Sequence, residues 1–450
     1  MNSKRAIFGG GLAAMLVAAG SSVGLGNIWR FPYLVGEGGG AAFIIVYLLA
    51  VIFIGHPIVL GEFVIGRSSR KNIFGATAQH GKGWSLLGVN SVLIAFLIPC
   101  FYLVVAGWTL KYVVSSASGA FVGFTTAAEY EGLFTSFVSG CWIPIICTLL
   151  FAVINYVVIA MGVQKGIERV SKFLMPTLFV LLVILAITSL TMPNSIEGLK
   201  YLFVPDFSKL TPRVVLDAIG QVFFSLSIGH GCLATYASYF SDELDLRKTA
   251  RQLAFVDTGV ALLAAVIILP AVFSVGIEPS AGPSLVFITL PSIFNSLPFS
   301  TLISTLFFAL LFIAALTSTL SMYEVVTAFL SEEFHLSRRK AMAINSIGVA
   351  AFAVLSSLSF GLLSEVRIFG GSIFDLFSDL TAQILLPIGG ILTSLYAAWA
   401  LDEKLVRGQL NCYGERVSPS VSFTLFMLKY ICPATIFVIF LDGLGVLRIF

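Results

Sequence analysis

The chain has 450 residues, of which 58% are hydrophobic and 11% are charged. Soluble domains carry about 25% charged residues, so this composition excludes a soluble fold and predicts an all-α integral membrane protein. The formal net charge of +3 gives no reason to expect a nucleic-acid partner. No HExxH, GxSxG or Walker-type phosphate loop occurs, so an enzyme or an ATP-driven pump has no support in the sequence.

Eleven apolar segments are each long enough to cross a bilayer, which takes about 20 residues. They fall at residues 8–35, 41–66, 88–115, 139–161, 169–191, 213–240, 250–276, 299–330, 340–362, 374–401 and 424–447. Residues 279–297 are punctuated by prolines and are expected to form an extracellular loop that dips toward the protein.

Basic residues are unevenly distributed between the two faces of these spans. Eighteen of the 26 Lys and Arg residues fall on the same face. Cytoplasmic loops carry the excess of basic residues in membrane proteins. We therefore expect a multi-pass protein of the cell (inner) membrane, with the N-terminus in the cytoplasm and the C-terminus outside.

The first span is interrupted near its middle by the stretch from Gly20 to Pro32, which contains an amide and Arg30. An arginine at the bilayer centre costs roughly 2.5–3.5 kcal/mol, so this cluster should face protein or water. Gly24 and Gly26 permit the backbone to leave helical geometry. Free carbonyls there would suit a cation, and the N-terminus of the following half-helix would suit a carboxylate. The alternative is a kinked helix filled by side chains of a neighbouring helix.

A second interrupted span occurs at the sixth position, from Gln221 to Gly231. Spans one and six occupy corresponding places if spans one to five and six to ten form two inverted halves. Paired broken helices of this kind indicate a transporter site near the midplane. We expect one transmembrane domain over residues 1–450, with a first five-helix repeat (8–191), a second (213–401) and an additional helix (424–447).

Several other polar residues lie at membrane depth. Glu62 either accepts hydrogen bonds from backbone N–H groups freed in spans one and six or is a protonated structural carboxyl. Asp257 either needs a cation, for which sodium is the economical partner, or caps a helix start.

Residues 314–322 hold four hydroxyls in five residues, which suits a hard cation, although such hydroxyls also bond to their own backbone. Tyr102 lies inside its span, and His230 is more often a packed core residue than a proton relay.

At these residues the chain resembles the neurotransmitter:sodium symporter family, whose bacterial members carry amino acids into the cell with sodium. The resemblance runs from Arg5 to about Leu447. The matching motifs are Gly20 to Pro32, Gly61-Glu62-Phe63, Phe101-Tyr102 with Gly107-Trp108, Gly220 to Gly231, Thr235 to Tyr239 and Ala314 to Thr319. The resemblance implies a leucine-transporter-like fold in which spans one, two, six and seven rock against the rest.

The resemblance also implies two sodium sites. The first comprises the Ser22 carbonyl, the Asn27 side chain, the Ser225 hydroxyl and carbonyl, and the Asp257 carboxylate. The family often has asparagine at the Asp257 position, and this aspartate looks like the fixed acidic group of chloride-independent members. The second site comprises the carbonyls of Gly20, Val23 and Ala314 with the hydroxyls of Thr317 and Ser318.

The implied substrate is an amino acid whose carboxylate contacts the first sodium, the amides near Gly24 and the Tyr102 hydroxyl. The implied substrate-binding residues are Ser22, Gly24, Leu25, Gly26, Ile98, Tyr102, Phe224, Ser225, Ser227, His230, Ser318, Thr319 and Met322. His230 replaces a residue that is usually apolar, so the identity of the substrate side chain stays open.

The resemblance further implies two gates. Arg30 with Asp379 would close the outer gate, with Asp375 as the alternative acidic partner. The residues implied for the inner gate are Arg5, Tyr239 and Glu332, and Glu62 is expected behind the site.

The sequence thus predicts a sodium-coupled symporter that imports a neutral, hydrophobic or aromatic amino acid by alternating access, independently of chloride. A non-transporting amino-acid receptor or an ion channel on the same scaffold is the alternative. The expected partners are the amino acid, sodium and the lipid bilayer, and the oligomeric state is open.

Overall fold

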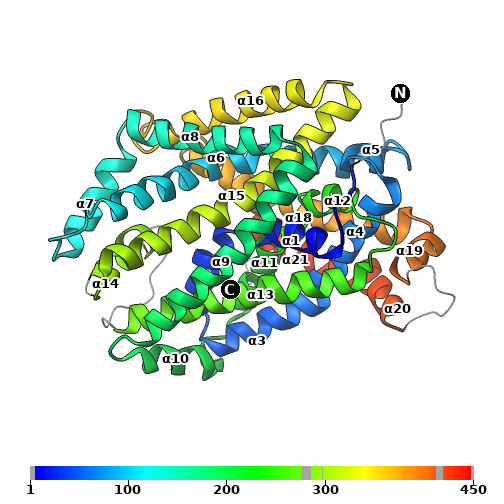
Figure 1. Ribbon diagram of the computed structural model, residues 1–450. Helices are drawn as coiled ribbons and strands as arrows, with labels where there is room; N and C mark the ends of the chain where they lie inside the picture. The colour runs from blue at the N-terminus through cyan, green and yellow to red at the C-terminus, as the bar shows by residue number, and fades with distance from the viewer. Residues whose placement is uncertain (1–5, 275–284, 296, 412–418, 447–450) are drawn as a thin grey trace.

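The computed structural model describes residues 6–274, 285–295, 297–411 and 419–446. This part of the chain is helical and contains two isolated β-bridges but no strand. The helices run side by side in a bundle (Figure 1). The predicted all-α membrane fold is confirmed.

Nine helices among the described residues are long and apolar enough to cross a membrane. They are Ala41–Ser69, α6 (Ser85–Ala117), α8 (Trp142–Ala160), Val163–Leu190, α13 (Leu246–Ser274), α15 (Ser300–Glu333), α16 (Arg338–Leu358), Ile373–Ala400 and Pro419–Gly443. Five of the labelled helices within these spans are α3 (Ala41–Ala50), α4 (His56–Ser69), α9 (Arg169–Leu190), α17 (Ile373–Asp379) and α18 (Leu386–Leu395). The last span contains α20 (Pro419–Phe426) and α21 (Cys432–Gly443).

One further span is broken, and the predicted sixth span is represented by two short helices. At the first position, α1 (Gly11–Ser22) is followed by η1 (Gly26–Arg30) and α2 (Phe31–Glu37), and the two parts are bent by 58°. At the sixth position, α11 (Pro212–Ser225) and α12 (Cys232–Ala237) are separated by six residues. Each of these two helices is too short to cross a membrane by itself. Both interruptions lie where the glycine and polar residues predict them.

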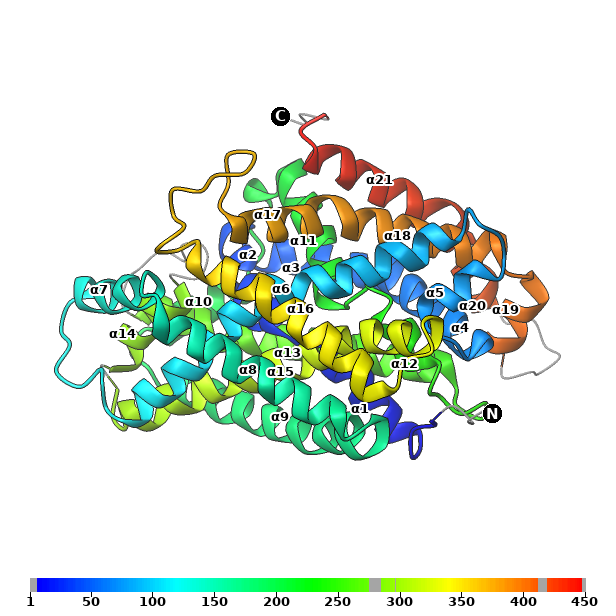
Figure 2. The same cartoon turned by 90° about the horizontal axis from the view of Figure 1, so that it is seen from above.

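Short helices connect the spans at the two ends of the bundle. They are α5 (Ile73–Ala78), α7 (Ala127–Val138), α10 (Ser195–Phe203), η4 (Phe207–Lys209), η5 (Leu285–Thr289), α14 (Leu290–Asn295) and α19 (Glu403–Leu410). Figures 1 and 2 show α5 and α19 at the end that holds the N-terminus, and α7 and α14 at the opposite end. Within the predicted extracellular loop, the described residues 285–295 form a short buried helical segment rather than a span.

The middle of the bundle is formed by α6 and α15, which pack against each other along their lengths. They run in opposite directions, because α6 begins beside α5 and ends toward α7 whereas α15 does the reverse (Figure 2). Residues 97–109 of α6 and 313–328 of α15 are all buried, which is typical of helix segments surrounded by protein. They provide a rigid wall beside the two helix breaks.

The outer helices expose apolar side chains. On α8 these include Ile146, Leu150, Val153 and Val157, which recur at helical spacing along one face. An apolar stripe of this kind is costly in water and favourable in lipid. The outside of the bundle is therefore suited to a bilayer.

Candidate functional site

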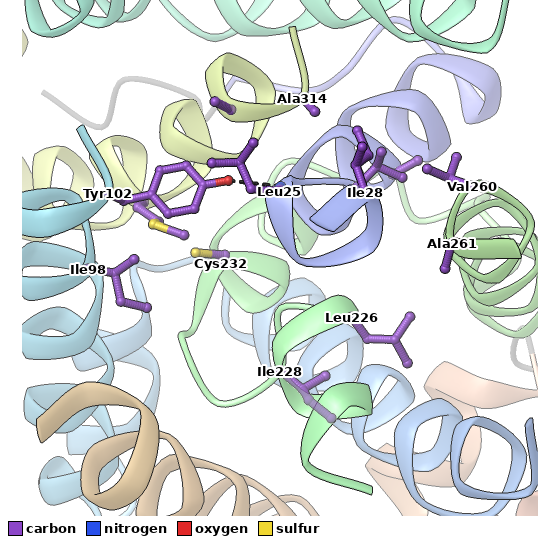
Figure 3. Close-up of a cluster of buried hydrophobic side chains, with 14 of the residues drawn as sticks. Leu25, Ile28, Ile98, Tyr102, Leu226, Ile228, Cys232, Val260, Ala261 and Ala314 are labelled. Carbon is purple, nitrogen blue, oxygen red and sulfur yellow. Dashed lines mark hydrogen bonds between the residues drawn. The ribbon is translucent and has the colours of Figure 1, made fainter. Parts of the chain in front are cut away.

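The first break brings bare backbone close to α6 and α15. The Leu25 N–H donates a hydrogen bond to the Tyr102 hydroxyl at 3.1 Å, and the Gly24 N–H donates to the Asn27 side-chain oxygen at 3.1 Å. A Cβ atom at Gly24 would lie only 2.5 Å from the Ser318 hydroxyl oxygen. Any larger residue there would displace the Ser318 hydroxyl and crowd the Tyr102 hydroxyl. Figure 3 shows Tyr102 reaching across to Leu25.

The second break is held open by positive-φ backbone and by Glu62. Ser227, Gly229 and Gly231 have φ values of 52°, 86° and 70°, which are left-handed conformations. The Glu62 carboxylate, which is buried inside α4, accepts hydrogen bonds from the N–H groups of Gly229 at 2.7 Å and Ala234 at 3.2 Å. Glu62 thus satisfies N–H groups freed by the break in span six.

A polar network joins the two breaks to α13. Asn27 donates from its amide nitrogen to Ser225 Oγ and to Asp257 Oδ1, each at 2.8 Å. Ser225 donates to Asp257 Oδ2 at 2.5 Å, and the Tyr47 hydroxyl lies 3.5 Å from the same oxygen. The Ser22 hydroxyl donates to the Leu226 carbonyl at 3.2 Å. The residues predicted for the first sodium site thus come together from four segments of the chain.

Asp257 is fully buried and lies inside α13, eleven residues after the helix begins at Leu246, so it is not a helix cap. All its hydrogen-bond donors in the described part of the chain are neutral groups. A buried carboxylate without a cationic partner is costly, so this site suits a bound cation. The amide of Asn27 presents its nitrogen to Asp257 and its oxygen to the Gly24 N–H, so hydrogen bonds at both ends fix its orientation.

The residues predicted for the second sodium site also lie together. The Ser318 hydroxyl donates to the Val23 carbonyl at 3.2 Å, and the Thr317 hydroxyl donates to the Ala314 carbonyl at 3.2 Å. A Cβ atom at Gly20 would lie 3.3 Å from Thr317 Cβ. The group is uncharged and rich in oxygen, which fits a hard monovalent cation better than a soft metal.

A small cavity of about 20 Å³ lies between the two breaks, α6 and α15. Its lining residues are Ser22, Gly24, Gly26, Ile98, Tyr102, Phe224, Ser227, His230, Ser318 and Met322. All ten were predicted for the substrate site. Thr319 was also predicted there, but its hydroxyl donates to the Asn155 side-chain oxygen at 2.7 Å, and Thr319 is not among the lining residues. Leu25 and Ser225 likewise do not line this cavity.

A second, larger cavity of about 490 Å³ adjoins the first, and Phe224 lines both. Arg30 lines the larger cavity, donates to the Gln221 side-chain oxygen at 2.8 Å and lies 5.6 Å from the centre of the Phe224 ring. Gln221 in turn donates to the Gly26 carbonyl at 3.1 Å. Asp379, predicted to pair with Arg30, is exposed and does not line this cavity. The alternative partner, Asp375, closes a capping box at the start of α17.

At the other side of the site, Tyr239 donates to the Glu324 carboxylate at 2.7 Å. The guanidinium of Arg338 pairs with the same carboxylate at 2.5 Å. The Glu332 carboxylate accepts two hydrogen bonds from Asn72. The backbone N–H of Asn72 donates at 2.8 Å, and the side-chain amide of Asn72 donates at 3.0 Å. Arg5, the third residue predicted for the inner gate, lies outside the described residues.

Sequence reasoning missed Tyr47, Gln221, Glu324 and Arg338 as members of these networks. Tyr47 stands alone as a hydroxyl in the apolar helix α3, and Glu324 is a carboxylate inside α15. A buried hydroxyl or carboxylate in an apolar span needs a partner, which is the signal that could have found both residues.

The chain was compared with known proteins. The model of the sodium:neurotransmitter symporter family matches residues 5–128 and 140–448. An uncharacterized sodium-dependent transporter of Bacillus subtilis, YhdH, is 37% identical over 436 residues, 96% of each chain. One from Haemophilus influenzae is 36% identical over 455 residues, 98% of this chain and 99% of its own. The crystal structure of MhsT in complex with L-phenylalanine is 40% identical, with a TM-score of 0.90, and the match covers 98% of this chain and 100% of MhsT. This chain therefore belongs to the sodium:neurotransmitter symporter family, a family of multi-pass, sodium-dependent membrane transporters.

Proposed function

We propose that this chain is a symporter that uses the sodium gradient to import a neutral amino acid, without a requirement for chloride. The observation that carries the proposal is Asp257, a fully buried carboxylate whose partners are all neutral, placed between two broken helices. A bound sodium ion would neutralise this carboxylate. The carboxylate in turn supplies, beside the ion, the negative charge that chloride provides in chloride-dependent members of the family. The similar MhsT was solved with L-phenylalanine, which supports an amino acid as the substrate.

Two sodium ions accompany each substrate in this proposal. Ser22, Asn27, Ser225 and Asp257 would hold the first ion, which also lies beside the substrate carboxylate. The second would be held by the group of Gly20, Val23, Ala314, Thr317 and Ser318. Because both groups connect span one to other helices, an ion bound in either of them stabilises one arrangement of the helices over another.

The substrate would bind in the small cavity, with its carboxylate at the Tyr102 hydroxyl and the backbone N–H groups of the first break. A cavity of about 20 Å³ holds little more than one water. The side chains that line both cavities are those of Tyr102 and Phe224. In this proposal Phe224 moves toward the larger cavity to admit an amino acid, and its return covers the substrate. Arg30 contacts both the Phe224 ring and Gln221, so it follows this movement and acts at the outer gate.

The larger cavity faces the outside of the cell in this proposal, and the N-terminus is cytoplasmic. The end of the bundle that carries α5 and α19 also carries basic residues, including Arg70, Lys71 and Arg407. Basic loops favour the cytoplasmic side. Tyr239, Glu324 and Arg338 then lie toward the cytoplasm and would separate when the site opens inward.

Uptake into proteoliposomes tests the proposal. The purified protein would be reconstituted and given labelled phenylalanine with an inward sodium gradient, with the same gradient of potassium as the control, and with chloride or gluconate as the anion. We expect saturable accumulation above equilibrium only with sodium and equally with either anion. Binding without accumulation would indicate a receptor, non-saturable flux a channel, and a need for chloride would contradict the assigned role of Asp257. Parallel measurement of labelled sodium flux gives the number of ions.

A further inference from the structure

His230 is a buried side chain whose hydrogen-bonding groups are unused. It lies in the break between α11 and α12, is 2% exposed and lines the small cavity. Neither ring nitrogen has a hydrogen-bond partner in the described part of the chain. A neutral imidazole carries one donor and one acceptor, and buried groups of this kind are nearly always paired in native structures. We therefore expect the hydrogen-bond partner of His230 to lie inside the cavity.

The cavity wall does not supply that partner. Its three serine hydroxyls each donate to a backbone carbonyl: Ser22 to Leu226 at 3.2 Å, Ser227 to Ser21 at 2.9 Å and Ser318 to Val23 at 3.2 Å. These bonds hold the serines to the two breaks rather than to the imidazole. His230 is thus free to bond to a molecule in the cavity.

The position of His230 along the cavity sets which part of an amino acid it can reach. Tyr102 and Ser318 lie at the level of Gly24, where the substrate carboxylate is proposed to bind. Ile98 is four residues before Tyr102 on α6, and Met322 is four residues after Ser318 on α15. Because these helices are antiparallel, Ile98 and Met322 lie on the same side, about one helical turn or 5.4 Å away. Figure 3 shows Ile98 and Tyr102 on the same face of α6.

His230 belongs to this second layer. The next residue, Gly231, lies against α6 beyond Ile98, because a Cβ atom there would be 2.9 Å from Cβ of Ser91, seven residues before Ile98. His230 therefore lies on the Ile98 side of Tyr102. The second layer thus combines two apolar side chains, Ile98 and Met322, with an imidazole. It suits a flat apolar group that carries one hydrogen-bonding atom at its edge.

We propose that this pocket selects aromatic amino acids whose ring has an N–H or O–H edge, tryptophan and tyrosine, and that His230 is the hydrogen-bond partner that determines this specificity. The inference rests on the proposed amino-acid transport function. The indole N–H or phenol O–H would donate to the imidazole nitrogen that carries no hydrogen. Serine and threonine hydroxyls lie too close to the α-carbon to reach the second layer, and leucine or phenylalanine would leave both ring nitrogens unpaired.

Matched ligand pairs test the proposal on the unmodified full-length protein. Sodium-dependent competition binding would compare tryptophan with its benzothienyl analogue, in which sulfur replaces the N–H group, and tyrosine with phenylalanine. We expect tryptophan and tyrosine to bind roughly 10- to 100-fold more tightly than their analogues, because a missing partner leaves a buried polar group unpaired. Equal affinities within each pair would overturn the proposal without any mutation.

Two variants complete the test. His230→Met keeps an apolar side chain in the second layer and removes the hydrogen bond, so both affinity ratios should fall to within about threefold while phenylalanine still binds. His56→Met is the matched control, because His56 also has a ring nitrogen without a partner but does not line the small cavity. Its ratios should be unchanged. Ratios that persist in His230→Met would refute the inference, whereas absence of any sodium-dependent amino-acid binding to the unmodified protein would refute the proposed function.

Discussion

Replacing Asp257 with asparagine removes the negative charge of the proposed first sodium site and changes the volume little. Ser225 and Asn27 contact the carboxylate at 2.5 and 2.8 Å, so a cation that they bind lies close to this charge. At a separation of about 4 Å and an effective dielectric constant of about 20, the attraction between two unit charges is about 4 kcal/mol. Since 1.4 kcal/mol corresponds to tenfold in affinity, the apparent sodium affinity of Asp257→Asn in chloride-free buffer should fall by roughly 100- to 1,000-fold.

The assay is sodium-dependent amino-acid uptake, measured with chloride or gluconate as the anion. We expect Asp257→Asn to be inactive in gluconate and either partly restored by chloride or inactive in both. Tyr47→Phe is the control, because it removes a hydroxyl 3.5 Å from the same carboxylate but keeps the charge. It should remain indifferent to chloride. Equal activity of Asp257→Asn with and without chloride, at normal sodium affinity, would refute the role assigned to this carboxylate.

Three further variants test other parts of the site. The double variant Thr317→Ala, Ser318→Ala should lower the apparent sodium affinity sharply at a near-normal yield of folded protein; an unchanged sodium dependence of uptake would place the second ion elsewhere. Tyr102→Phe should weaken binding of every amino acid by roughly 1.5–3 kcal/mol, the value for a hydrogen bond to a charged group. An effect limited to one substrate would instead assign Tyr102 to side-chain recognition. Glu62→Gln replaces one of two acceptor oxygens that hold the second break, so thermal unfolding should show a loss of about 1–3 kcal/mol; an unchanged melting temperature would show that this break does not need the carboxylate.

The sequence by itself determined the membrane character of the chain, the place of most spans and the position of both helix breaks. These features depend on local chemistry. Lipid demands about 20 consecutive apolar residues per span, and a polar, glycine-rich interruption at membrane depth can persist only beside protein or a cavity. The stretches from Gly20 to Pro32 and from Gln221 to Gly231 are polar, glycine-rich interruptions of this kind. They can be recognised without knowing how the rest of the chain folds. The resemblance to a known family then named ten residues that line one cavity.

Only the tertiary structure decided which side chains bond to one another. Asn27 and Asp257 are 230 residues apart, and Thr319 and Asn155 are 164 residues apart. The direction in which such side chains point depends on how distant helices pack. Thr319 therefore bonds to Asn155 instead of lining the cavity, and Arg30 bonds to Gln221 rather than to the acidic partner that the sequence suggested. A hydrogen bond tolerates only a few tenths of an ångström of variation in the distance between donor and acceptor, and no local pattern in one segment records where another segment will lie.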